Sequence, residues 1–347
     1  MPASQDAPFL AACRREPTPY TPIWLMRQAG RYQPEYRAIR EKVSFVELCR
    51  SPDLACEVTV RAVDQLGVDA AILFADILLI LEPLNIGFEF TPADGPRIPR
   101  PLRTAADIDR VAEAIDPADS LGFVMEAVRR IRAELDGRVP LVGFSGEPFT
   151  LASYAIEGGG SRDYAHTKRL MRTDEGAWNA LMGRLSDAVL AYLSAQIDAG
   201  AQAVQLFDSW VGCLSRRDYE RYVQPHVRRI FKGLGDRVPT IHFGQGNADL
   251  YPAMKAAGGD VISVDWRVPL GRTWAELGPD EVAIQGNLDP TAILAPFDVL
   301  ETEAIGVLEE AAARPGHVFN LGHGILKHSD VDQVRRLVDL VHEVSAR

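Results

Sequence analysis

Two arginines near the N-terminus have the type and spacing of an anion-binding site. An apolar, strand-like run ends in a loop that carries Arg27 and Arg31, with Gly30 between them. The guanidinium group presents a planar set of donors that fits a carboxylate or a phosphate, and it stays charged at physiological pH. We therefore interpret this segment as an anion-binding loop on a rigid scaffold. The alternative is that both arginines are surface charges paired with Glu35 or Glu41.

Asp76 and His323 are the next residues that could take part in chemistry. Asp76 lies inside an apolar stretch, where an unpaired carboxylate is costly to bury. It must therefore cap a helix, pair with a cation or bind donors of a ligand. His323 lies between Gly322 and Gly324 after an apolar run. A histidine there could donate to an anion or transfer a proton, and a purely structural role is the alternative.

The segment that ends at Glu147 has small residues after another apolar run. Ser145 is followed by Gly146 and Glu147, so the spacing departs from the G-x-S-x-G nucleophile elbow, which requires a glycine at position 147. A serine hydrolase is therefore a poor interpretation. The glycines at 158–160 indicate either a mobile loop over a site or the end of a helix.

Composition restricts the class of protein. The 347 residues are 47% hydrophobic and 24% charged, and the formal net charge is −11. This acidic balance disfavours nucleic acid and anionic membranes as partners, and no apolar run approaches the roughly 20 residues of a membrane-spanning helix. The first ten residues do not resemble a signal peptide. The four cysteines include no C-x-x-C pair and no zinc spacing, so we expect reduced thiols, no metal and a cytoplasmic location.

Short apolar runs alternate with helical patterns along the whole chain, which predicts a single α/β domain over residues 1–347. The runs are continuous, as buried parallel strands are. Eight of them suggest a (β/α)8 TIM barrel with extra helices, and an open doubly wound sheet is the alternative. No G-x-G-x-x-G follows the first run, which weakens a dinucleotide-binding fold. The eight runs are Pro22–Met26, Ala70–Phe74, Pro140–Phe144, Ala203–Phe207, Thr240–Phe243, Val261–Val264, Val282–Gln285 and Val318–Leu321.

Three helices can be delimited from the sequence. Ser51 is a candidate N-cap before Pro52, and Gly67 should end that helix. An i, i+4 stripe of apolar residues between 181 and 193 predicts a second helix that stops before Gly200. A third is expected over Val331–Val344.

A barrel predicts that the residues at the carboxyl ends of the strands line one face, where the active sites of such folds lie. Each of the eight ends carries a polar or ionisable group, although loops are often polar for other reasons. These residues are Arg27, Asp76, Ser145 with Glu147, Asp208 with Ser209, His242, Asp265, Asn287 and His323.

Several ordered motifs make the chain resemble the uroporphyrinogen decarboxylase family of the haem pathway. The resemblance extends from about Pro22 to the C-terminal helix. Its motifs are the sequence IWLMRQAGRY at 23–32, FADIL at 74–78, GFSGEPFTL at 143–151, QLFDS at 205–209 and NLGHG at 320–324. Two details differ from the family: Glu147 stands where a small residue is usual, and the proline expected shortly after Gly324 is missing.

The resemblance implies a (β/α)8 barrel, a homodimer and no cofactor, with a tetrapyrrole as the small-molecule substrate. The implied reaction converts the four acetate arms of uroporphyrinogen III to methyl groups and gives coproporphyrinogen III and CO₂. By position, the substrate-binding residues would be Arg27, Gln28, Ala29, Gly30, Arg31, Asp76, Tyr154, Ser209 and His323, and the catalytic ones Asp76, Arg27 and Arg31.

These residue types suit that chemistry. Arginines suit the substrate carboxylates, and the carboxylate of Asp76 suits the pyrrole N–H groups at the centre of the macrocycle. Protonation of a pyrrole carbon gives a cation that accepts electrons as CO₂ leaves, and a fixed carboxylate would stabilise it. The pyrrole is its own electron sink, so no cofactor is required. Arg27 or Arg31 would orient the acetate and is one candidate proton donor, beside a bound water or a substrate carboxyl group.

Two other functions compete with this interpretation. A related group of barrel methyltransferases uses a zinc site that begins His-x-Cys after a middle strand. Here His242 is followed by Phe243 and Gly244, and no cysteine lies after Cys213. The second alternative is a non-catalytic tetrapyrrole carrier with the same pocket, which motifs alone do not distinguish from the enzyme.

Overall fold

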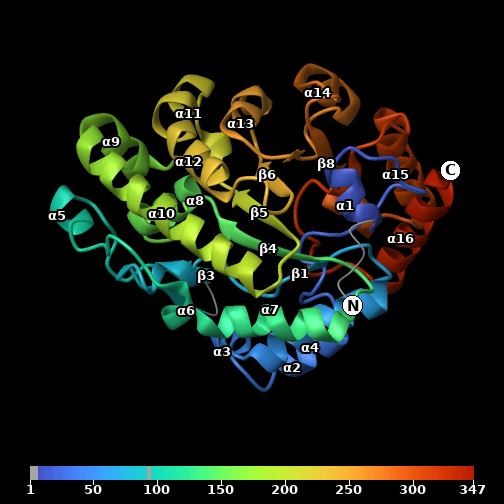
Figure 1. The fold of residues 1–347 in the computed structure, drawn as a ribbon, viewed down its shortest axis with the longest axis horizontal. Coiled ribbons are helices and arrows are strands. Elements are labelled where there is room, and N and C mark those ends of the chain that lie inside the picture. The colour runs from blue at the N-terminus through green and yellow to red at the C-terminus, as the bar shows by residue number, and fades with distance from the viewer. Residues whose placement is uncertain (1–6, 92–94) are drawn as a thin grey trace.

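A curved parallel sheet forms the centre of the computed structural model, which describes residues 7–91 and 95–347 (Figure 1). Seven strands are hydrogen-bonded in chain order, as in a barrel, whereas a doubly wound sheet reverses its order at a switch point. The strands of this sheet are β1 (Ala71–Ile72), β4 (Leu141–Gly146), β5 (Ala203–Asp208), β6 (Thr240–Gly244), β7 (Val261–Ser263), β8 (Ala283–Leu288) and β9 (His317–Leu321).

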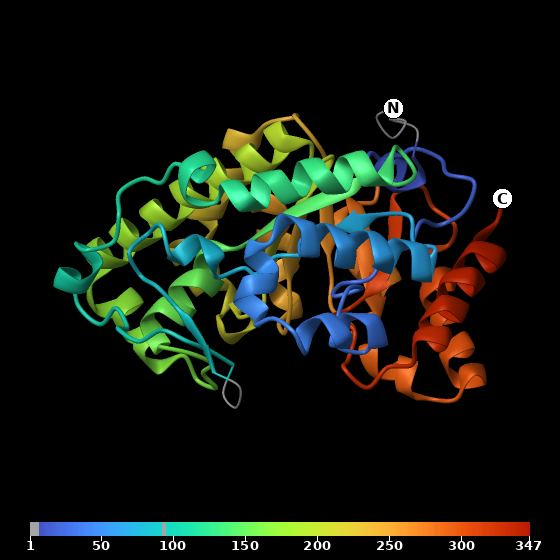
Figure 2. The same ribbon diagram turned by 90° about the horizontal axis from the view of Figure 1, so that it is seen from below.

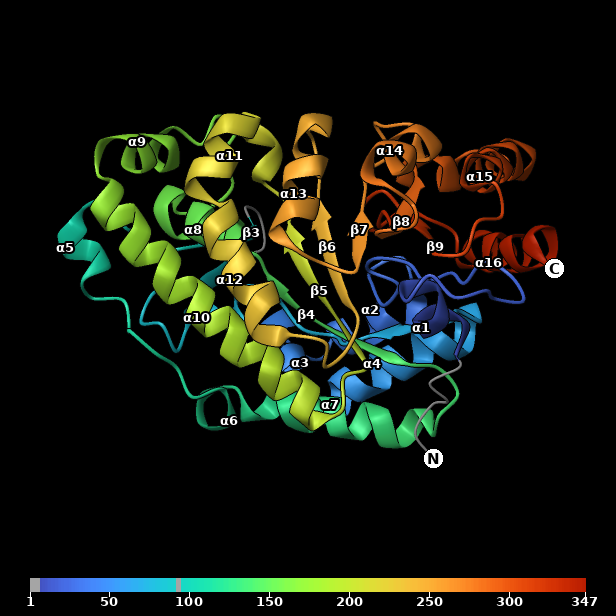
Figure 3. The same cartoon turned by 45° about the horizontal axis from the view of Figure 1, so that its top comes forward.

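Helices surround the outside of this sheet (Figures 2 and 3). The helices of the N-terminal half are α1 (Pro8–Cys13), α2 (Pro34–Arg40), α3 (Phe45–Arg50), α4 (Pro52–Leu66), α5 (Ala105–Ile108), α6 (Pro117–Ser120), α7 (Gly122–Leu135) and α8 (Pro148–Glu157). Those of the C-terminal half are α9 (Ala165–Thr173), α10 (Glu175–Ala199), α11 (Arg216–Tyr222), α12 (Gln224–Leu234), α13 (Tyr251–Ala257), α14 (Leu270–Leu277), α15 (Phe297–Ala311) and α16 (Val331–Ser345). Short 3₁₀ turns are η1 (Leu79–Leu81), η2 (Val211–Cys213), η3 (Ala248–Leu250) and η4 (Pro290–Leu294).

Seven of the eight predicted strands are confirmed, but the prediction of a closed eight-stranded barrel was wrong. The first run, Pro22–Met26, lies between β9 and β1 and forms one isolated bridge, Ile23 to Phe319. Most of its backbone N–H groups donate to side chains rather than to a neighbouring strand. Ile23 N donates to Asp69 Oδ2 (2.7 Å) and Met26 N to Asn320 Oδ1 (3.0 Å). Because side chains take these donors, no second ladder forms and the sheet stays open at this position.

A buried polar network nevertheless ties this segment to the opposite side of the sheet. Trp24 Nε1 donates to Gln285 Oε1 at 2.8 Å. Gln285 Nε2 in turn donates to Gln205 Oε1 (3.1 Å) and to Ser263 Oγ (2.9 Å). These residues lie on β8, β5 and β7, so the network crosses the interior of the curved sheet. This network keeps the segment before the arginine loop in position, a role that a backbone ladder would have in a closed barrel.

A small hairpin that the sequence did not predict lies outside this sheet. β2 (Glu89–Thr91) and β3 (Gly95–Arg97) pair antiparallel, with Phe90 opposite Pro96. The run is short and carries proline and glycine, which are depleted in strands, so periodicity alone gives it little weight.

The predicted helices are confirmed. Ser51 accepts from Leu54 N at the start of α4, and Gly67 ends that helix with a left-handed φ of 70°. The apolar stripe lies on α10, which ends at Gly200. The last helix is α16, within one residue of the predicted end. In Figure 2, α4 and α7 run beside one another, and their residues are in contact.

None of the helices in the described ranges is long and apolar enough to cross a membrane.

Candidate functional site

The structure divides the polar residues of the strand ends into an accessible group and a buried group. Arg27 is exposed, and Asp76, Ser209 and His323 are partly accessible. The other residues at the predicted face are buried and do not reach solvent. Side chains alternate between the two faces of a strand, and several of these residues lie within a strand rather than after it. The buried residues are Ser145, Glu147, Asp208, His242, Asp265 and Asn287.

Arg27 has a strained backbone that its neighbours impose. Its φ is +63°, a region that residues other than glycine rarely adopt. Gln28 fixes the turn, since its Oε1 accepts from Leu25 N (3.1 Å) and its Nε2 donates to Ala70 O (3.0 Å). Gly324 lies against the side chain of Arg27, where a Cβ would overlap the Arg27 Cδ atom. The turn that Gln28 fixes and the contact with Gly324 together limit the directions that the Arg27 side chain can take.

The side chain of Gln28 is therefore structural in this conformation. It is 1% exposed and both of its polar atoms are engaged within the protein. Gly30 N donates to Gln33 Oε1 (3.0 Å), which shapes the next part of the loop. Ala29 packs against a small apolar cluster that includes Tyr36. These three residues support the loop on which the arginines lie.

The arginines do not form the surface ion pairs that the alternative interpretation required. Among the described residues, neither Arg27 nor Arg31 is paired with Glu35 or Glu41. Arg27 is exposed to solvent, yet much of its side chain lies close to other protein atoms. This partial desolvation lowers the pKa of Arg27. The charge of Arg31 lowers it further, whereas the charges of Tyr154 and Asp76 raise it.

Asp76 combines a hydrogen bond from a turn amide with a perturbed carboxyl group. Its Oδ1 accepts from Leu78 N at 2.8 Å in the turn before η1, but the N-cap of η1 is Leu78 and no side chain caps it, so Asp76 does not cap that element. Burial raises its pKa from 3.8 to about 6, and the Leu78 amide and the charge of Arg27 counteract that effect. Its other oxygen has no hydrogen-bond partner within residues 7–91 and 95–347. That oxygen remains able to accept from a ligand.

Tyr154 on α8 lies in the same electrostatic neighbourhood. Its pKa is raised by burial and by Asp76, while a contact with Trp210 and the charge of Arg27 lower it. The rings of Tyr154 and Trp210 are 5.8 Å apart, measured between centroids. Ser209 precedes Trp210, so the β5 turn and α8 form one wall. Trp210 was not identified from the sequence, because nothing in its spacing distinguishes it from a core aromatic residue.

His323 is held as a neutral donor. Gly324 N lies 2.5 Å from His323 Nδ1 and donates to it, so the ring proton resides on Nε2. Burial and the charges of Arg27 and Arg267 lower its pKa to about 4. The Nε2–H can therefore donate to an anion at neutral pH.

Arg267 is a second residue that sequence reasoning missed at this end of the sheet. Its Nη1 lies 2.8 Å from Asp265 Oδ2, and its guanidinium lies 3.9 Å from the ring centroid of Trp266. Half of its side chain is exposed. The available sequence signal was its position three residues after the end of the predicted strand Val261–Val264.

The glycines at 158–160 include a helix end. Gly158 has a φ of 91° and its amide donates to Tyr154 O, which terminates α8. A Cβ at Gly158 would approach Pro101 to 2.9 Å.

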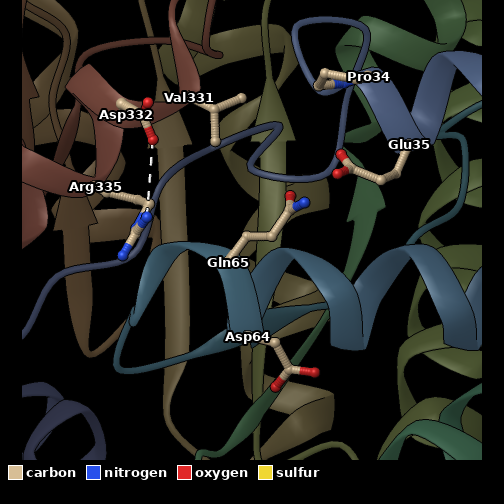
Figure 4. A pocket seen from close by; sticks show the side chains of 7 residues that line it. All are labelled: Pro34, Glu35, Asp64, Gln65, Val331, Asp332 and Arg335. Atoms are coloured by element: carbon tan, nitrogen blue, oxygen red, sulfur yellow. Dashed lines mark ion pairs between the residues drawn. The ribbon is translucent and has the colours of Figure 1, made fainter.

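A separate pocket lies between α2, α4 and α16 on the outside of the molecule (Figure 4). It contains none of the predicted site residues. Its one ion pair joins Asp332 and Arg335 at 3.7 Å. Its lining is Pro34, Glu35, Asp64, Gln65, Val331, Asp332 and Arg335. We place the site at the strand ends, where the perturbed groups and the strained loop meet.

Metal ligands do not converge anywhere in the described ranges, where no group of three or more His, Cys, Asp or Glu side chains could hold an ion. His242, the one candidate zinc ligand, directs Nδ1 to Gly258 O at 3.0 Å. All four cysteines are free thiols.

Comparisons with known proteins agree on one family. The model of the uroporphyrinogen decarboxylase (URO-D) family matches residues 4–344. A protein named uroporphyrinogen decarboxylase from Carboxydothermus hydrogenoformans is 54% identical over 339 residues, 97% of this chain and 96% of the relative. One of the same name from Sorangium cellulosum is 56% identical over 337 residues, with the same coverage. Among solved structures, a methyltransferase from Methanosarcina mazei has a TM-score of 0.80 at 20% identity and covers 97% of each chain, which shows a shared fold.

Proposed function

The chain belongs to the uroporphyrinogen decarboxylase family of lyases, which act in haem biosynthesis, and we propose which of its residues perform the reaction. The substrate is uroporphyrinogen III, whose four acetate arms become methyl groups. The product is coproporphyrinogen III, and one CO₂ leaves for each arm. The observation that carries the assignment of residues is the meeting of Asp76, Arg27 and Tyr154 beside the strained arginine loop.

Arg27, Arg31 and His323 bind the carboxylates of the substrate. Charge-assisted hydrogen bonds from arginine to a carboxylate are strong, and the guanidinium fixes the orientation of the group. His323 adds a neutral N–H donor because its Nδ1 is already occupied by Gly324 N. Tyr154 and Ser209 line the wall beside them. Gln28, Ala29 and Gly30 contribute by shaping the loop.

Asp76 accepts the pyrrole N–H groups and stabilises the cationic intermediate. Protonation at the pyrrole carbon places positive charge on the ring. The bond between the acetate methylene and its carboxylate then breaks, the electron pair moves into the ring, and CO₂ leaves. A proton then adds to the methylene carbon to complete the methyl group, and the ring carbon loses the proton that it gained in the first step, so that one proton is consumed for each CO₂ released. An ionised Asp76 offers the charge of opposite sign in a partly desolvated site, where such electrostatic effects are largest.

The proton donor for the pyrrole carbon is Arg27 in this proposal. Desolvation lowers its pKa, which makes the guanidinium a better acid than it is in water. A bound water or a substrate carboxyl group is the alternative source. No step requires a cofactor, because the protonated pyrrole is the electron sink.

We further propose that residues 1–347 form one domain, that two copies associate as a homodimer, and that the protein works in the cytoplasm. One hydrophobic core runs from Phe9 on α1 to Val341 on α16, which supports a single domain. The free thiols suit a reducing compartment. The dimer rests on the family alone, and sedimentation velocity would test it.

The decisive experiment is an anaerobic incubation of the purified protein with uroporphyrinogen III. The mixture is then oxidised, and the porphyrins are separated by their number of carboxyl groups. Four-carboxyl product with seven-, six- and five-carboxyl intermediates is expected. Unchanged eight-carboxyl material from folded protein would reject the activity, and a binding titration would then test the carrier function.

A zinc-dependent methyltransferase is disfavoured despite the shared fold. Gly244 stands where such a site needs a thiolate, and a Cβ there would overlap the Met254 side chain. His242 Nδ1 is directed to a backbone carbonyl, and its Nε2 lies against Glu147. The donor set that remains does not suit a thiolate-bound zinc ion.

A further inference from the structure

Two carboxyl groups and an imidazole lie buried together behind the wall of the proposed site. Glu147 is the residue before α8, Asp208 is the last residue of β5, and His242 lies on β6. All three side chains are 0% exposed. Buried ionisable groups are costly unless they are paired or neutral, so this cluster needs an explanation that core packing does not give.

The contacts of His242 define which of its nitrogens carries a proton. Nδ1 lies 3.0 Å from Gly258 O, an atom that can only accept, so Nδ1 is the donor. Nε2 then bears a lone pair when the ring is neutral. Glu147 Oε2 lies 3.1 Å from that Nε2. Burial lowers the pKa of His242 to about 4, so the ring is neutral at pH 7.

The contacts of the carboxyl groups require a proton on the pair. In the described part of the chain, no donor reaches either oxygen of Glu147 or Oδ2 of Asp208. Glu147 Oε2 lies 3.1 Å from His242 Nε2, and a carboxylate oxygen and a lone pair at this distance are two acceptors without a donor. Burial raises the pKa of Glu147 to about 8, and burial together with Glu147 raises the pKa of Asp208. Glu147, buried without a donor and facing the lone pair of His242 Nε2, is thus the neutral acid of the cluster.

The remaining groups that face the cluster do not replace this proton. Tyr219 on α11 is buried with its hydroxyl unpaired in the described structure, and burial raises its pKa. The charge of Arg228 on α12 lowers the pKa of Tyr219 and so opposes the effect of burial. Burial raises the pKa of Tyr164 and of Cys213, and the charge of Asp208 raises both further. None of these donates a hydrogen bond to the carboxyl pair.

A short chain of hydrogen bonds joins this pair to the site. Thr150 Oγ1 donates to Asp208 Oδ1 at 2.6 Å and accepts from Trp210 N at 3.2 Å. The ring of Trp210 lies between Tyr154 (5.8 Å) and Tyr164 (5.9 Å), measured between centroids. The state of Asp208 therefore affects the turn that carries Ser209 and one wall of the proposed site.

We propose that Glu147 is a neutral acid whose proton is directed to His242 Nε2, and that it is a positioning residue for the Ser209–Trp210 turn. Glu147 reaches the substrate only through Asp208, Thr150 and Trp210. Ionisation of Glu147 would place two carboxylates side by side in a buried site and would disrupt the bond from Thr150. The activity readout of this inference rests on the proposed function, whereas the state of the proton can be measured without substrate.

The proposal makes a quantitative prediction for pH. With a pKa of about 8, the protonated fraction of Glu147 falls from about 90% at pH 7 to about 10% at pH 9. If only the protonated form holds the turn in place, the apparent KM rises about tenfold over this range while kcat changes little. Other groups also titrate there, so matched variants are needed.

Glu147→Gln tests this, with Glu276→Gln as the control. Glutamine keeps a donor for Asp208 or His242 and cannot ionise, so its KM should stay flat from pH 7 to pH 9. Glu276 is an exposed residue of α14 paired with Arg272, and its variant should retain the wild-type rise in KM. A rise in KM of Glu147→Gln equal to that of the wild type would overturn the proposal.

Infrared spectroscopy of the wild-type protein provides a readout that needs no substrate. A carbonyl band of a buried protonated acid should be present at pH 7 and disappear with a midpoint near pH 8. Assignment to Glu147 requires loss of the band in Glu147→Gln and its retention in Glu276→Gln. A wild-type spectrum without such a band at pH 7 refutes a neutral Glu147. Absence of decarboxylation with the band present would instead refute only the proposed function.

Discussion

Asp76→Asn should lower activity and raise stability at the same time. The side chain keeps its shape, and its Oδ1 can still accept from Leu78 N. What is lost is the negative charge that the proposal places beside the cationic pyrrole. Removal of one such preorganised electrostatic group typically costs about 3–4 kcal/mol, or a factor of roughly 10²–10³ in kcat.

The stability effect has the opposite sign. Burial raises the carboxyl pKa from 3.8 to about 6, so the native state binds the proton more tightly than the unfolded chain does. Wild-type stability therefore falls as pH rises from about 4 to 6 and stays lower above that range. The pKa change corresponds to about 3 kcal/mol, which we reduce to about 2 kcal/mol because Asp76 is partly exposed. Asp76→Asn removes this penalty at pH 7.

The two effects are measured separately. Single-turnover conversion of uroporphyrinogen III gives the rate of the first decarboxylation, and urea unfolding at pH 5 and pH 7 gives stability. We expect a loss of at least about 10²-fold in rate with a gain in stability confined to the higher pH. Near-normal turnover would refute the role of Asp76 in charge stabilisation. Loss of activity together with loss of stability would show that the residue acts through folding instead.

Three further predictions concern the residues around Asp76. Arg27→Lys keeps the charge and loses the planar set of donors, so KM for uroporphyrinogen should rise about ten- to hundredfold in steady-state assays. Gly324→Ala places a Cβ against Arg27 and should raise KM similarly, whereas Gly306→Ala, in open space on α15, should only stabilise the helix by about 1 kcal/mol in thermal unfolding. His323→Gln should lower kcat/KM without changing its pH profile above pH 5, because His323 is already neutral there. A shifted profile would contradict that protonation state, and an unaffected KM in Gly324→Ala would contradict the packing argument.

Local signals in the sequence were sufficient where a single element decides the outcome. Ser51 and Gly67 fixed the limits of α4, because capping depends on the side chain and φ of one residue at each end. The apolar runs located seven strands, because parallel strands in this sheet are buried on both faces. The five ordered motifs, of which the segment around Arg27 is the first, identified the family, whose model covers almost the entire chain.

Long-range partners were beyond the reach of these signals. Whether Pro22–Met26 pairs as a strand depended on Asp69 and Asn320, which are remote in sequence and take its amides. Trp24 meets Gln285 because its segment lies against β9 and β8 is the next strand, whereas Gln285 reaches Gln205 on β5 only because the sheet curves. The direction of the Arg27 side chain likewise depends on Gly324, nearly three hundred residues away.

The sequence by itself determined the βα organisation, the chemical types available at the strand ends and the family. Only the tertiary structure decided which of those groups face an open site and which face the interior. Arg27, Asp76 and His323 are reached by solvent, whereas Glu147 and His242 are fully buried. The physical reason is that a residue's type and its place along a strand leave its surroundings undefined. Desolvation and neighbouring charges set protonation states, and both arise from the packing of distant segments.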